Sequence, residues 1–373
     1  AGLLLGIYQW TNFWDFVIYY VVTGGVVLFA NMITYSGKAR NVLIVTALQA
    51  VEVMGIAIAA ALPFTLTFDG MTQGVAIARN HSAFYQLCVL WGLPIALVLL
   101  YIFSLLWGRV HQKIHCIMSE IAPADLYILI LGLCAIGLIV IPELVYVRDI
   151  YENGNARSNT MFKLTYQAYL MFGISMAYII FRFIAVCRKK IMKGAGIVGL
   201  CLLLMTTGYF GNAVRHWFGK VWDPPLYEGL DATRFLETDF PADAAAIRWL
   251  RANIEGSPVV LEADGLSYTG YERVSAMTGL PTILGWYTHE QLWRGNDVED
   301  LNEKSAQVRE IYTSTDEKRV SELLQEYGVS YIFVGSTERE KYGSELNDGL
   351  LQSLGTIVFE DENYGTYILQ VGQ

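Results

Sequence analysis

Six charged residues stand in one short segment between two long apolar runs of this 373-residue chain. The apolar runs are 126–141 and 164–185, and the segment between them holds Glu143, Arg148, Asp149, Glu152, Arg157 and Lys163. Ionisable groups at the rim of a bilayer are costly unless they are paired or hydrated, so they indicate a functional site. The alternative interpretation is a solvated loop whose basic residues anchor the next helix among lipid headgroups.

The basic residues of this segment suit an anion. Asn159 and Thr160 can start a helix that Lys163 joins in its first turns. The free N–H groups and the positive dipole end of that helix would point to the same place as Arg157 and Lys163. We therefore predict an anion site for a phosphate at headgroup depth.

Two further acids belong to the apolar part of the chain. Asp15 stands at the start of the first apolar run, where the helix dipole favours an acid and leaves it available to a ligand. Glu52 lies well inside the second run. We expect Glu52 to face the other helices and to be paired or protonated, because an unpaired carboxylate inside a bilayer is expensive.

The charge balance divides the chain into two parts. Residues 1–213 hold 13 Lys and Arg against 8 Asp and Glu, a balance of +5, whereas residues 214–373 carry −14. This contrast is typical of a membrane domain (1–213), a membrane-proximal connector (214–240) and a soluble domain (241–373). The acidic second half argues against a nucleic-acid partner. Because the chain opens without an initiator Met or a basic segment, we expect it to be the C-terminal part of a longer protein.

The membrane half has room for about six spanning helices of about 20 apolar residues each. The candidates are 16–33, 42–66, 83–107, 126–146, 164–186 and 196–210. Basic residues gather in the connections 36–41, 108–125 and 182–193, which the positive-inside rule places in the cytoplasm. The charged segment and the soluble domain then share the extracytoplasmic side of the cell membrane. We expect them to lie close together.

The soluble half alternates helix and strand. Its periodicity predicts a helix at 241–253, a strand at 257–263, a helix at 318–327, a strand at 329–334 and a hairpin of 356–360 with 366–371. The predicted fold is thus an α-helical polytopic membrane bundle followed by a small α/β domain.

One segment of the soluble half, 276–295, is broken by Gly and Pro and rich in ring side chains. It holds His289, Glu290, Trp293 and Arg294 close to Trp286. Loops of this kind commonly carry function, and Arg294 suits a forked contact with a phosphate or carboxylate. The alternative is a domain–membrane interface formed by the aromatic residues.

Three segments resemble the YYY-type uncharacterised integral membrane proteins, a family related to GT-C polyprenyl-phosphate-sugar glycosyltransferases. They are Asn-Phe-Trp-Asp at 12–15, Arg-Ser-Asn-Thr-Met-Phe-Lys at 157–163, and Thr-Gly-Leu-Pro-Thr-Ile-Leu-Gly-Trp at 278–286 with the residues up to 295. The resemblance implies a membrane glycosyltransferase that uses a lipid-phosphate-linked sugar donor at the outer leaflet. GT-C enzymes usually place their catalytic acid in the first outward loop, after the first helix. If an upstream part of the protein holds that loop, this chain lacks the principal acid and would have no activity by itself.

The resemblance also implies roles for single residues. Arg148, Arg157, Asn159 and Lys163 would hold the donor phosphate, and Asp149 or Asp15 would act as base or hold a divalent cation. His289, Glu290, Trp293 and Arg294 would bind the acceptor or cap the groove. We expect Arg157→Ala or Lys163→Ala to weaken lipid-phosphate binding while stability changes by less than about 1 kcal/mol. The alternatives are a transporter or flippase of a lipid-linked or small polar substrate, and a non-catalytic membrane scaffold.

Overall fold

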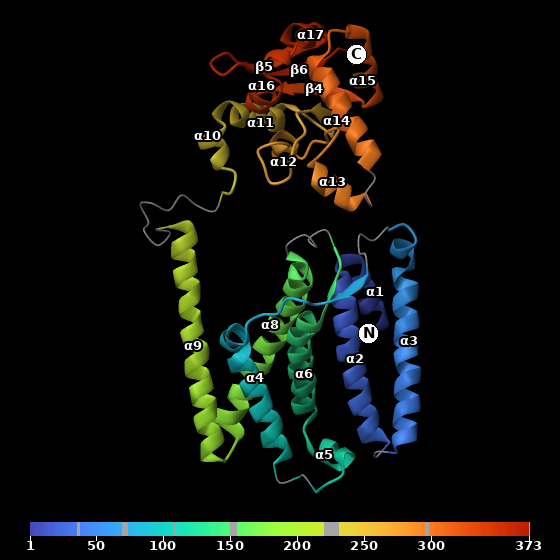
Figure 1. Cartoon of the computed structure of the whole chain (residues 1–373), viewed down its shortest axis with the longest axis vertical. Helices are drawn as coiled ribbons and strands as arrows, with labels where there is room; N and C mark the ends of the chain where they lie inside the picture. Colours follow the sequence, from blue (N-terminus) through green and yellow to red (C-terminus); the bar gives the residue numbers. More distant parts are fainter. Residues whose placement is uncertain are drawn as a thin grey trace. The chain divides into compact units, whose positions relative to one another are not determined.

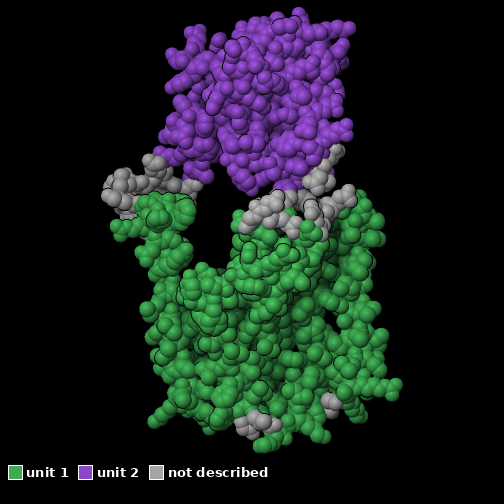
Figure 2. Space-filling model, viewed as in Figure 1, with its two compact units in different colours: residues 1–223 green, residues 224–373 purple. Residues whose placement is uncertain are grey.

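The computed structural model describes residues 1–35, 38–68, 74–107, 109, 111–149, 155–219, 231–294 and 298–372. The chain divides into two compact units, Ala1–Asp223 and Pro224–Gln373, coloured separately in Figure 2. Each unit has its own hydrophobic clusters.

Six helices of the described residues are long and apolar enough to cross a membrane, which confirms the predicted number. They are α2 (Phe13–Thr34), α3 (Ala39–Thr65), α4 (Phe84–Leu106), α6 (Pro123–Leu144), α8 (Ser158–Phe181) and α9 (Lys190–Phe218), shown in Figure 1. A π-helical turn, η1 (Arg182–Val186), extends α8 to Val186. The last helix differs most from its predicted range, 196–210, and the fifth span begins six residues before its predicted range, 164–186. The difference in the last helix lies at both of its ends. Its 29 residues run on into basic side chains at both ends, which an apolar criterion excludes and a membrane helix tolerates by snorkelling.

A shorter helix, α1 (Gly2–Thr11), precedes the first span and packs against α2 and α3. Two of its glycines permit this contact. A Cβ at Gly6 would lie 2.6 Å from the Cβ of Ala60, and one at Gly2 would lie 2.7 Å from the Cβ of Ile56. The α1–α3 contact therefore uses small residues to bring two backbones together, as membrane helices commonly do.

The core of the bundle lies between α6 and α8, with α2 and α4 packed against them. Phe172, Ile179 and Ala168 of α8 are fully buried there. Glycines again set the close approaches, because a Cβ at Gly132 would lie 2.7 Å from Val98 and one at Gly196 would lie 2.8 Å from Phe183. In the last span Gly196 and Gly199 lie close to neighbouring side chains, whereas Gly194 and Gly208 have open space beside them.

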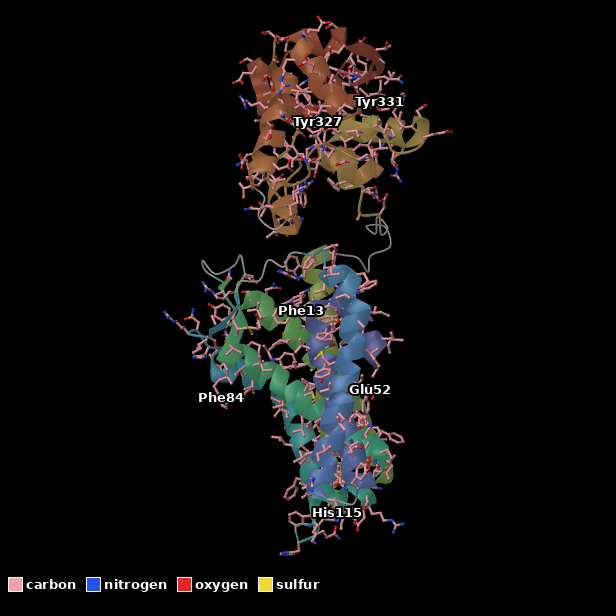
Figure 3. The ribbon with its side chains drawn as sticks, turned by 90° about the vertical axis from the view of Figure 1, so that its right-hand side faces the viewer. Phe13, Glu52, Phe84, His115, Tyr327 and Tyr331 are labelled. Atoms are coloured by element: carbon pink, nitrogen blue, oxygen red, sulfur yellow. The ribbon has the colours of Figure 1, made fainter. Side chains whose placement is uncertain are left out.

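Glu52 was predicted to face the other helices, and this prediction is wrong. It lies midway along α3 (Figure 3), and its side chain is exposed. The helix packs through Ala57 and Ala61, which are nearly fully buried. At about 100° per residue, Glu52 lies about 140° from Ala57 and on the opposite side from Ala61. The packing face of α3 is therefore set by its small residues, and the carboxylate falls outside it.

The two ends of the bundle carry different connections. The α2–α3 and α8–α9 connections and helix α5 (Ile114–Glu120) lie at one end, which we call the basic end (Figure 1). The α3–α4 and α6–α8 connections lie at the other, which we call the pocket end. At the pocket end β1 (Val75–Ile77) and β2 (Val145–Val147) form a two-stranded antiparallel sheet.

The second unit has one four-stranded sheet in the order β3-β4-β6-β5. Its strands are β3 (Val259–Leu261), β4 (Val329–Val334), β5 (Gly355–Asp361) and β6 (Thr366–Val371); β3 and β4 are parallel and the other pairs antiparallel. The predicted strands and hairpin are confirmed to within a few residues. Gly328, at φ +60°, follows the helix that precedes β4 and ends it with a left-handed residue.

Helices cover both faces of this sheet. Side chains alternate along β4, so Ile332 and Val334 pack with α14 (Val298–Thr313) and α15 (Glu317–Glu326), while Phe333 packs with α11 (Pro241–Asn253). The predicted helices at 241–253 and 318–327 correspond to α11 and α15. Shorter elements complete the unit: α10 (Phe235–Asp239), α12 (Arg273–Thr278), α13 (Tyr287–Trp293), α16 (Ser336–Tyr342), η3 (Gly343–Glu345) and α17 (Asp348–Ser353). The small α/β domain is therefore confirmed.

Candidate functional site

A pocket of about 780 Å³ lies at the pocket end of the bundle. Residues of β1, the segment that follows it, β2 and the first turn of α8 line this pocket. Its polar side chains are Arg79, Asn80, Tyr146, Arg148, Asn155, Arg157 and Ser158. Three arginines from two connections thus line one space, and all lie within a few residues of a span end.

The small sheet explains how distant residues reach this pocket. The chain leaves α6 at Val145, where the backbone becomes extended, and pairs with β1 in the register Val75↔Val147 and Ile77↔Val145. Arg79 follows β1 by two residues and Arg148 follows β2 by one. Because the strands are antiparallel, the two arginines lie beyond opposite ends of the sheet, and both line the pocket.

Arg157 is fixed in the pocket wall by an ion pair with Glu143. Its Nη1 lies 2.7 Å from Glu143 Oε1 and donates to the Pro142 carbonyl at 3.2 Å, while its Nη2 donates to Ser82 Oγ at 3.0 Å. Glu143 in turn accepts hydrogen bonds from the backbone N–H and the hydroxyl of Ser82, at 2.8 and 2.7 Å. The Arg157 side chain is only 16% exposed. Arg157 is therefore a structural partner as well as a pocket residue, and a negligible stability cost of its removal is no longer expected.

The start of α8 is tied to the strand before it. Asn159 Nδ2 donates to Asp149 Oδ2 at 3.0 Å, and the Thr160 hydroxyl accepts from the Val147 N–H at 2.9 Å. Helix α8 begins at Ser158, so the predicted helix start near Asn159 and Thr160 is correct. These two bonds hold the carboxylate of Asp149 beside the first turn of the helix, next to the residues that line the pocket.

Lys163 does not join Arg157 in the pocket. It lies in the second turn of α8, where its Nζ is 5.9 Å from the Phe162 ring centroid, and it is absent from the pocket wall. Ser158 and Met161 of α8 line the pocket. At about 100° per residue, Lys163 lies about 140° from Ser158 and about 160° from Met161 around the helix. The predicted pairing of these two cations therefore fails on helix geometry.

Asp15 also lies outside the pocket wall. It stands in the first turn of α2 and accepts a hydrogen bond of 2.7 Å from Gln167 Nε2 of α8, whose Oε1 accepts from Tyr19 at 2.9 Å. The side chain is half-buried. This bridge joins the first span to α8, so the role of Asp15 that the structure describes is a helix–helix contact.

Arg79 is the pocket residue that the sequence interpretation missed. Its side chain is exposed and lines the pocket with Arg148 and Arg157. The sequence signal for this residue is its charge: the α3–α4 connection carries few basic residues, and Arg79 lies shortly before α4 begins. The pairing of β1 with β2, which the sequence did not reveal, brings this arginine to the others.

The soluble unit has a pocket of its own, of about 880 Å³, which contains two of the predicted residues, His289 and Glu290. The rings of Tyr268, Trp286 and His289 contact one another, with centroids 5.1 to 5.4 Å apart. The Trp286 indole N–H donates to the Tyr271 carbonyl at 2.9 Å, so the ring that lines the pocket is held in place. A fixed indole ring is a platform for stacking a sugar or another flat ligand.

The other two predicted residues of this segment differ in position. Arg294 lies outside the pocket wall and pairs with Glu290 at 2.6 Å and with Asp300 at 3.2 Å. Glu290 also accepts from the Gly285 N–H at 3.1 Å. Trp293 ends α13, and its side chain lies outside what the structure describes. His289 and Glu290 therefore line the pocket, and Arg294 forms an ion pair with Glu290 from a position outside the pocket wall.

Two non-glycine residues near this pocket have left-handed backbone, Tyr268 at φ +62° and Glu272 at φ +63°. The Glu272 carboxyl is buried and has no hydrogen-bond partner among the described residues. Burial, and next to it the charge of Glu262, raises the pKa of Glu272 to about 10. Strained backbone often marks functional segments, and nothing in the sequence pattern points to these two positions.

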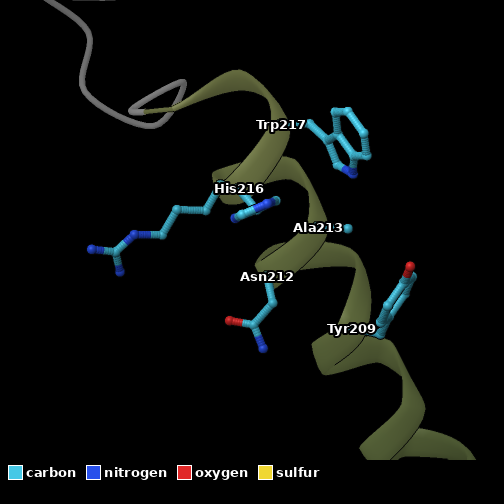
Figure 4. Close-up of a pocket in the computed structure, with 6 residues that line it drawn as sticks. Tyr209, Asn212, Ala213, His216 and Trp217 are labelled. Carbon is cyan, nitrogen blue, oxygen red and sulfur yellow. The ribbon is translucent and has the colours of Figure 1, made fainter.

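The hollow at the end of α9 is no candidate site, and the described residues form no candidate metal site. A hollow of about 690 Å³ at the end of α9 is lined by Tyr209, Asn212, Ala213, Arg215, His216 and Trp217 (Figure 4). All of these come from one helix, so among the described residues the hollow has no second wall. No group of three or more His, Cys, Asp or Glu side chains that could hold a metal ion occurs in the described ranges, and Asp15 and Asp149 belong to no such group.

The six apolar helices and the α/β unit define a polytopic α-helical membrane protein with a small second domain. Residues 1–123 and 110–172 match the model of a family described as "Uncharacterized membrane protein (DUF2298)". The match supports the predicted resemblance to an uncharacterised family of integral membrane proteins. It includes β1, β2 and the first turns of α8, and hence the residues of the arginine-lined pocket. No curated protein matches the chain.

Proposed function

We propose that this protein is a GT-C-like membrane glycosyltransferase that takes a sugar donor linked to a lipid phosphate at the outer leaflet. The observation that carries the proposal is the convergence of Arg79, Arg148 and Arg157 on one pocket at the span ends. A phosphate attached to a membrane lipid lies at this depth. Guanidinium groups bind phosphate oxygens through forked, charge-assisted hydrogen bonds.

The proposed chemistry places these arginines on the leaving group. An acceptor hydroxyl attacks the anomeric carbon of the donor, the carbon–oxygen bond to phosphate breaks, and the lipid phosphate leaves with the electron pair. Negative charge grows on the phosphate in this step, so fixed positive charge beside it lowers the barrier. Arg157 is held rigid by Glu143 and Ser82, which gives the pocket a cation that needs no reorganisation.

The proton of the acceptor hydroxyl requires a base. Asp149 is our first choice, because its hydrogen bond to Asn159 holds it at the start of α8, beside residues of the pocket wall. Asp15 is the second choice and lies against α8 through Gln167. In the proposal Lys163 serves as an outer cation for the lipid phosphate. In the proposal the acceptor binds in the pocket that contains His289 and Glu290. Trp293 and Arg294 follow these two residues closely in the chain.

A binding titration with the purified full chain tests the donor site. The probe is a short-chain polyprenyl phosphate, and the corresponding polyprenol, which lacks the phosphate, is the ligand control. Arg79→Gln and Arg148→Gln should each weaken binding of the phosphate about fivefold, the factor that corresponds to about 1 kcal/mol per cation. Lys38→Gln, an exposed cation at the basic end, is the matched control and should leave binding unchanged.

Equal binding of polyprenol and polyprenyl phosphate, or equal losses in Arg148→Gln and Lys38→Gln, would contradict the phosphate site. Transfer of sugar from a lipid-phosphate donor, abolished by Asp149→Asn, would support the enzyme. Binding that persists with movement of the lipid across a vesicle membrane, and without sugar transfer, would instead favour a flippase. Glu52 is exposed on α3 away from the packed helices, so it gives a flippase no charged group within the bundle at that position.

A further inference from the structure

A second basic pocket lies at the opposite, basic end of the bundle. It has a volume of about 270 Å³ and is enclosed by α4, η1 and the start of α9. Two cations line it, Arg182 and Lys189, together with apolar side chains that include Leu105, Val186 and Met192. No residue of this pocket takes part in the site proposed above.

Arg182 is held in this wall by a buried carboxylate. Asp125 is 3% exposed and accepts three hydrogen bonds, from the Tyr101 and Tyr178 hydroxyls at 2.6 Å each and from Arg182 Nη2 at 2.8 Å. Arg182 nevertheless keeps 31% of its side chain exposed. The carboxylate therefore fixes the guanidinium at the pocket and leaves part of it accessible to a ligand.

The π-helical turn brings the second cation to the same place. The Cys187 N–H bonds to the Arg182 carbonyl, five residues back, and α9 begins three residues later at Lys190. Gly196 of α9 packs closely on Phe183, so the chain folds back on itself without a gap. Arg182 and Lys189 thus line one pocket from the two sides of the turn, and π-turns are frequent at functional sites.

The side chains around this pocket suit a membrane lipid. Lys189 Nζ lies 5.6 Å from the ring centroid of Trp107, an exposed residue at the end of α4 of the kind found in interfacial aromatic belts. Phe103, Val186 and Ile191 expose apolar side chains on the adjoining helix faces, where acyl chains can lie. A soluble anion has no acyl chains that could contact these apolar surfaces.

We propose that this pocket binds the phosphate headgroup of an anionic membrane lipid in the leaflet at the basic end, with Lys189 and Arg182 as the phosphate contacts. Basic pockets between membrane helices are a general mode of anionic-lipid recognition. The lipid would join α4 to the α8–α9 turn. This inference is independent of glycosyl transfer.

Native mass spectrometry of the delipidated full chain tests the proposal. Phosphatidylglycerol and phosphatidylcholine with identical acyl chains are the two probes. We expect preferential binding of phosphatidylglycerol, weakened about fivefold by Lys189→Gln and retained by Lys189→Arg. Arg188→Gln removes the same charge from the neighbouring residue, which is exposed and does not line the pocket, and should change binding by less than about twofold.

Three results would overturn the proposal. They are equal binding of the two lipids, equal losses in Lys189→Gln and Arg188→Gln, and displacement of phosphatidylglycerol by inorganic phosphate at the same concentration. The last would assign the pocket to a soluble anion. Arg148→Gln separates the two basic pockets: it should leave the Lys189-dependent binding intact, and loss of that binding in Arg148→Gln would place the lipid at the pocket end instead.

Discussion

Arg157 Nη1 and Glu143 Oε1 lie 2.7 Å apart and join the residue that precedes α8 to the last turn of α6. Both side chains are largely buried, 16% and 15% exposed, and Ser82 completes the hydrogen bonding of both. The ion pair closes the connection between the two most deeply packed helices of the bundle. It also presents the guanidinium to the arginine-lined pocket.

Stability should depend on this ion pair. Arg157→Ala leaves the largely buried Glu143 carboxylate with Ser82 but without its arginine partner, so the free energy of unfolding should fall by about 2 kcal/mol. Lys163→Ala, which removes a distant contact with the Phe162 ring, should cost less than about 1 kcal/mol. Denaturant unfolding in mixed micelles measures both. The double variant Arg157→Ala/Glu143→Gln should cost less than the two single changes together, and strictly additive costs would show that the pair contributes nothing.

The topology prediction places Lys38, Arg109 and Lys189 on the cytoplasmic side, with Arg157 and the α/β domain on the other. Single cysteines introduced at Lys38 and at Glu340 in a chain without its five native cysteines test this by labelling in intact cells. Glu340 is exposed, whereas Glu338 beside it is buried and unsuitable for labelling. Glu340→Cys should react before permeabilisation and Lys38→Cys only afterwards; the reverse order would overturn the topology.

The α/β domain should lose stability as pH rises. Burial raises the pKa of Glu338 to about 7, and burial together with Glu262 raises that of Glu272 to about 10, from an ordinary value of 4.5. The folded domain therefore holds protons that the unfolded chain releases. This stabilisation is complete below about pH 4.5, and it declines as pH rises toward about 7 for Glu338 and about 10 for Glu272.

Hydrogen exchange of the full chain measures this effect. Amides of β4 and β6, corrected for intrinsic exchange, should be less protected at about pH 8 than at about pH 5. Glu272→Gln removes the largest of these shifts and should raise stability at about pH 8 by more than about 1 kcal/mol. Glu340→Gln, an exposed neighbour of Glu338, should leave the profile unchanged. Protection that increases with pH would refute the assignment.

Much of the fold could be predicted from sequence because it follows from local pattern. The six apolar runs, the 241–253 helix and the hairpin near the C-terminus are all signals contained within one segment. Helix α1 and the face of α3 that packs could not be predicted in the same way. They depend on which small residues, such as Gly6 and Ala57, meet across two helices, and that is decided by tertiary packing.

The candidate site was predictable only in part. The charged segment 143–163 stood out, and Arg148 and Arg157 do line a pocket. The pattern could not show that Arg79 joins them, because β1 is only three residues long and pairs with a strand about 70 residues away in sequence. The pattern also grouped Lys163 with Arg157, but the rotation of α8 turns Lys163 away from the pocket wall. The strained Glu272 has no sequence signal.

The most direct test of the arginine-lined pocket is photo-crosslinking in native membranes. A polyprenyl phosphate that carries a photoreactive group next to its phosphate is irradiated with the full chain, and the modified peptides are identified by mass spectrometry. We predict crosslinks within residues 76–80 and 155–161, reduced by excess unlabelled polyprenyl phosphate and by Arg148→Gln. Crosslinks confined to other helices, or unaffected by the competitor and by Arg148→Gln, would contradict a lipid-phosphate site in this pocket.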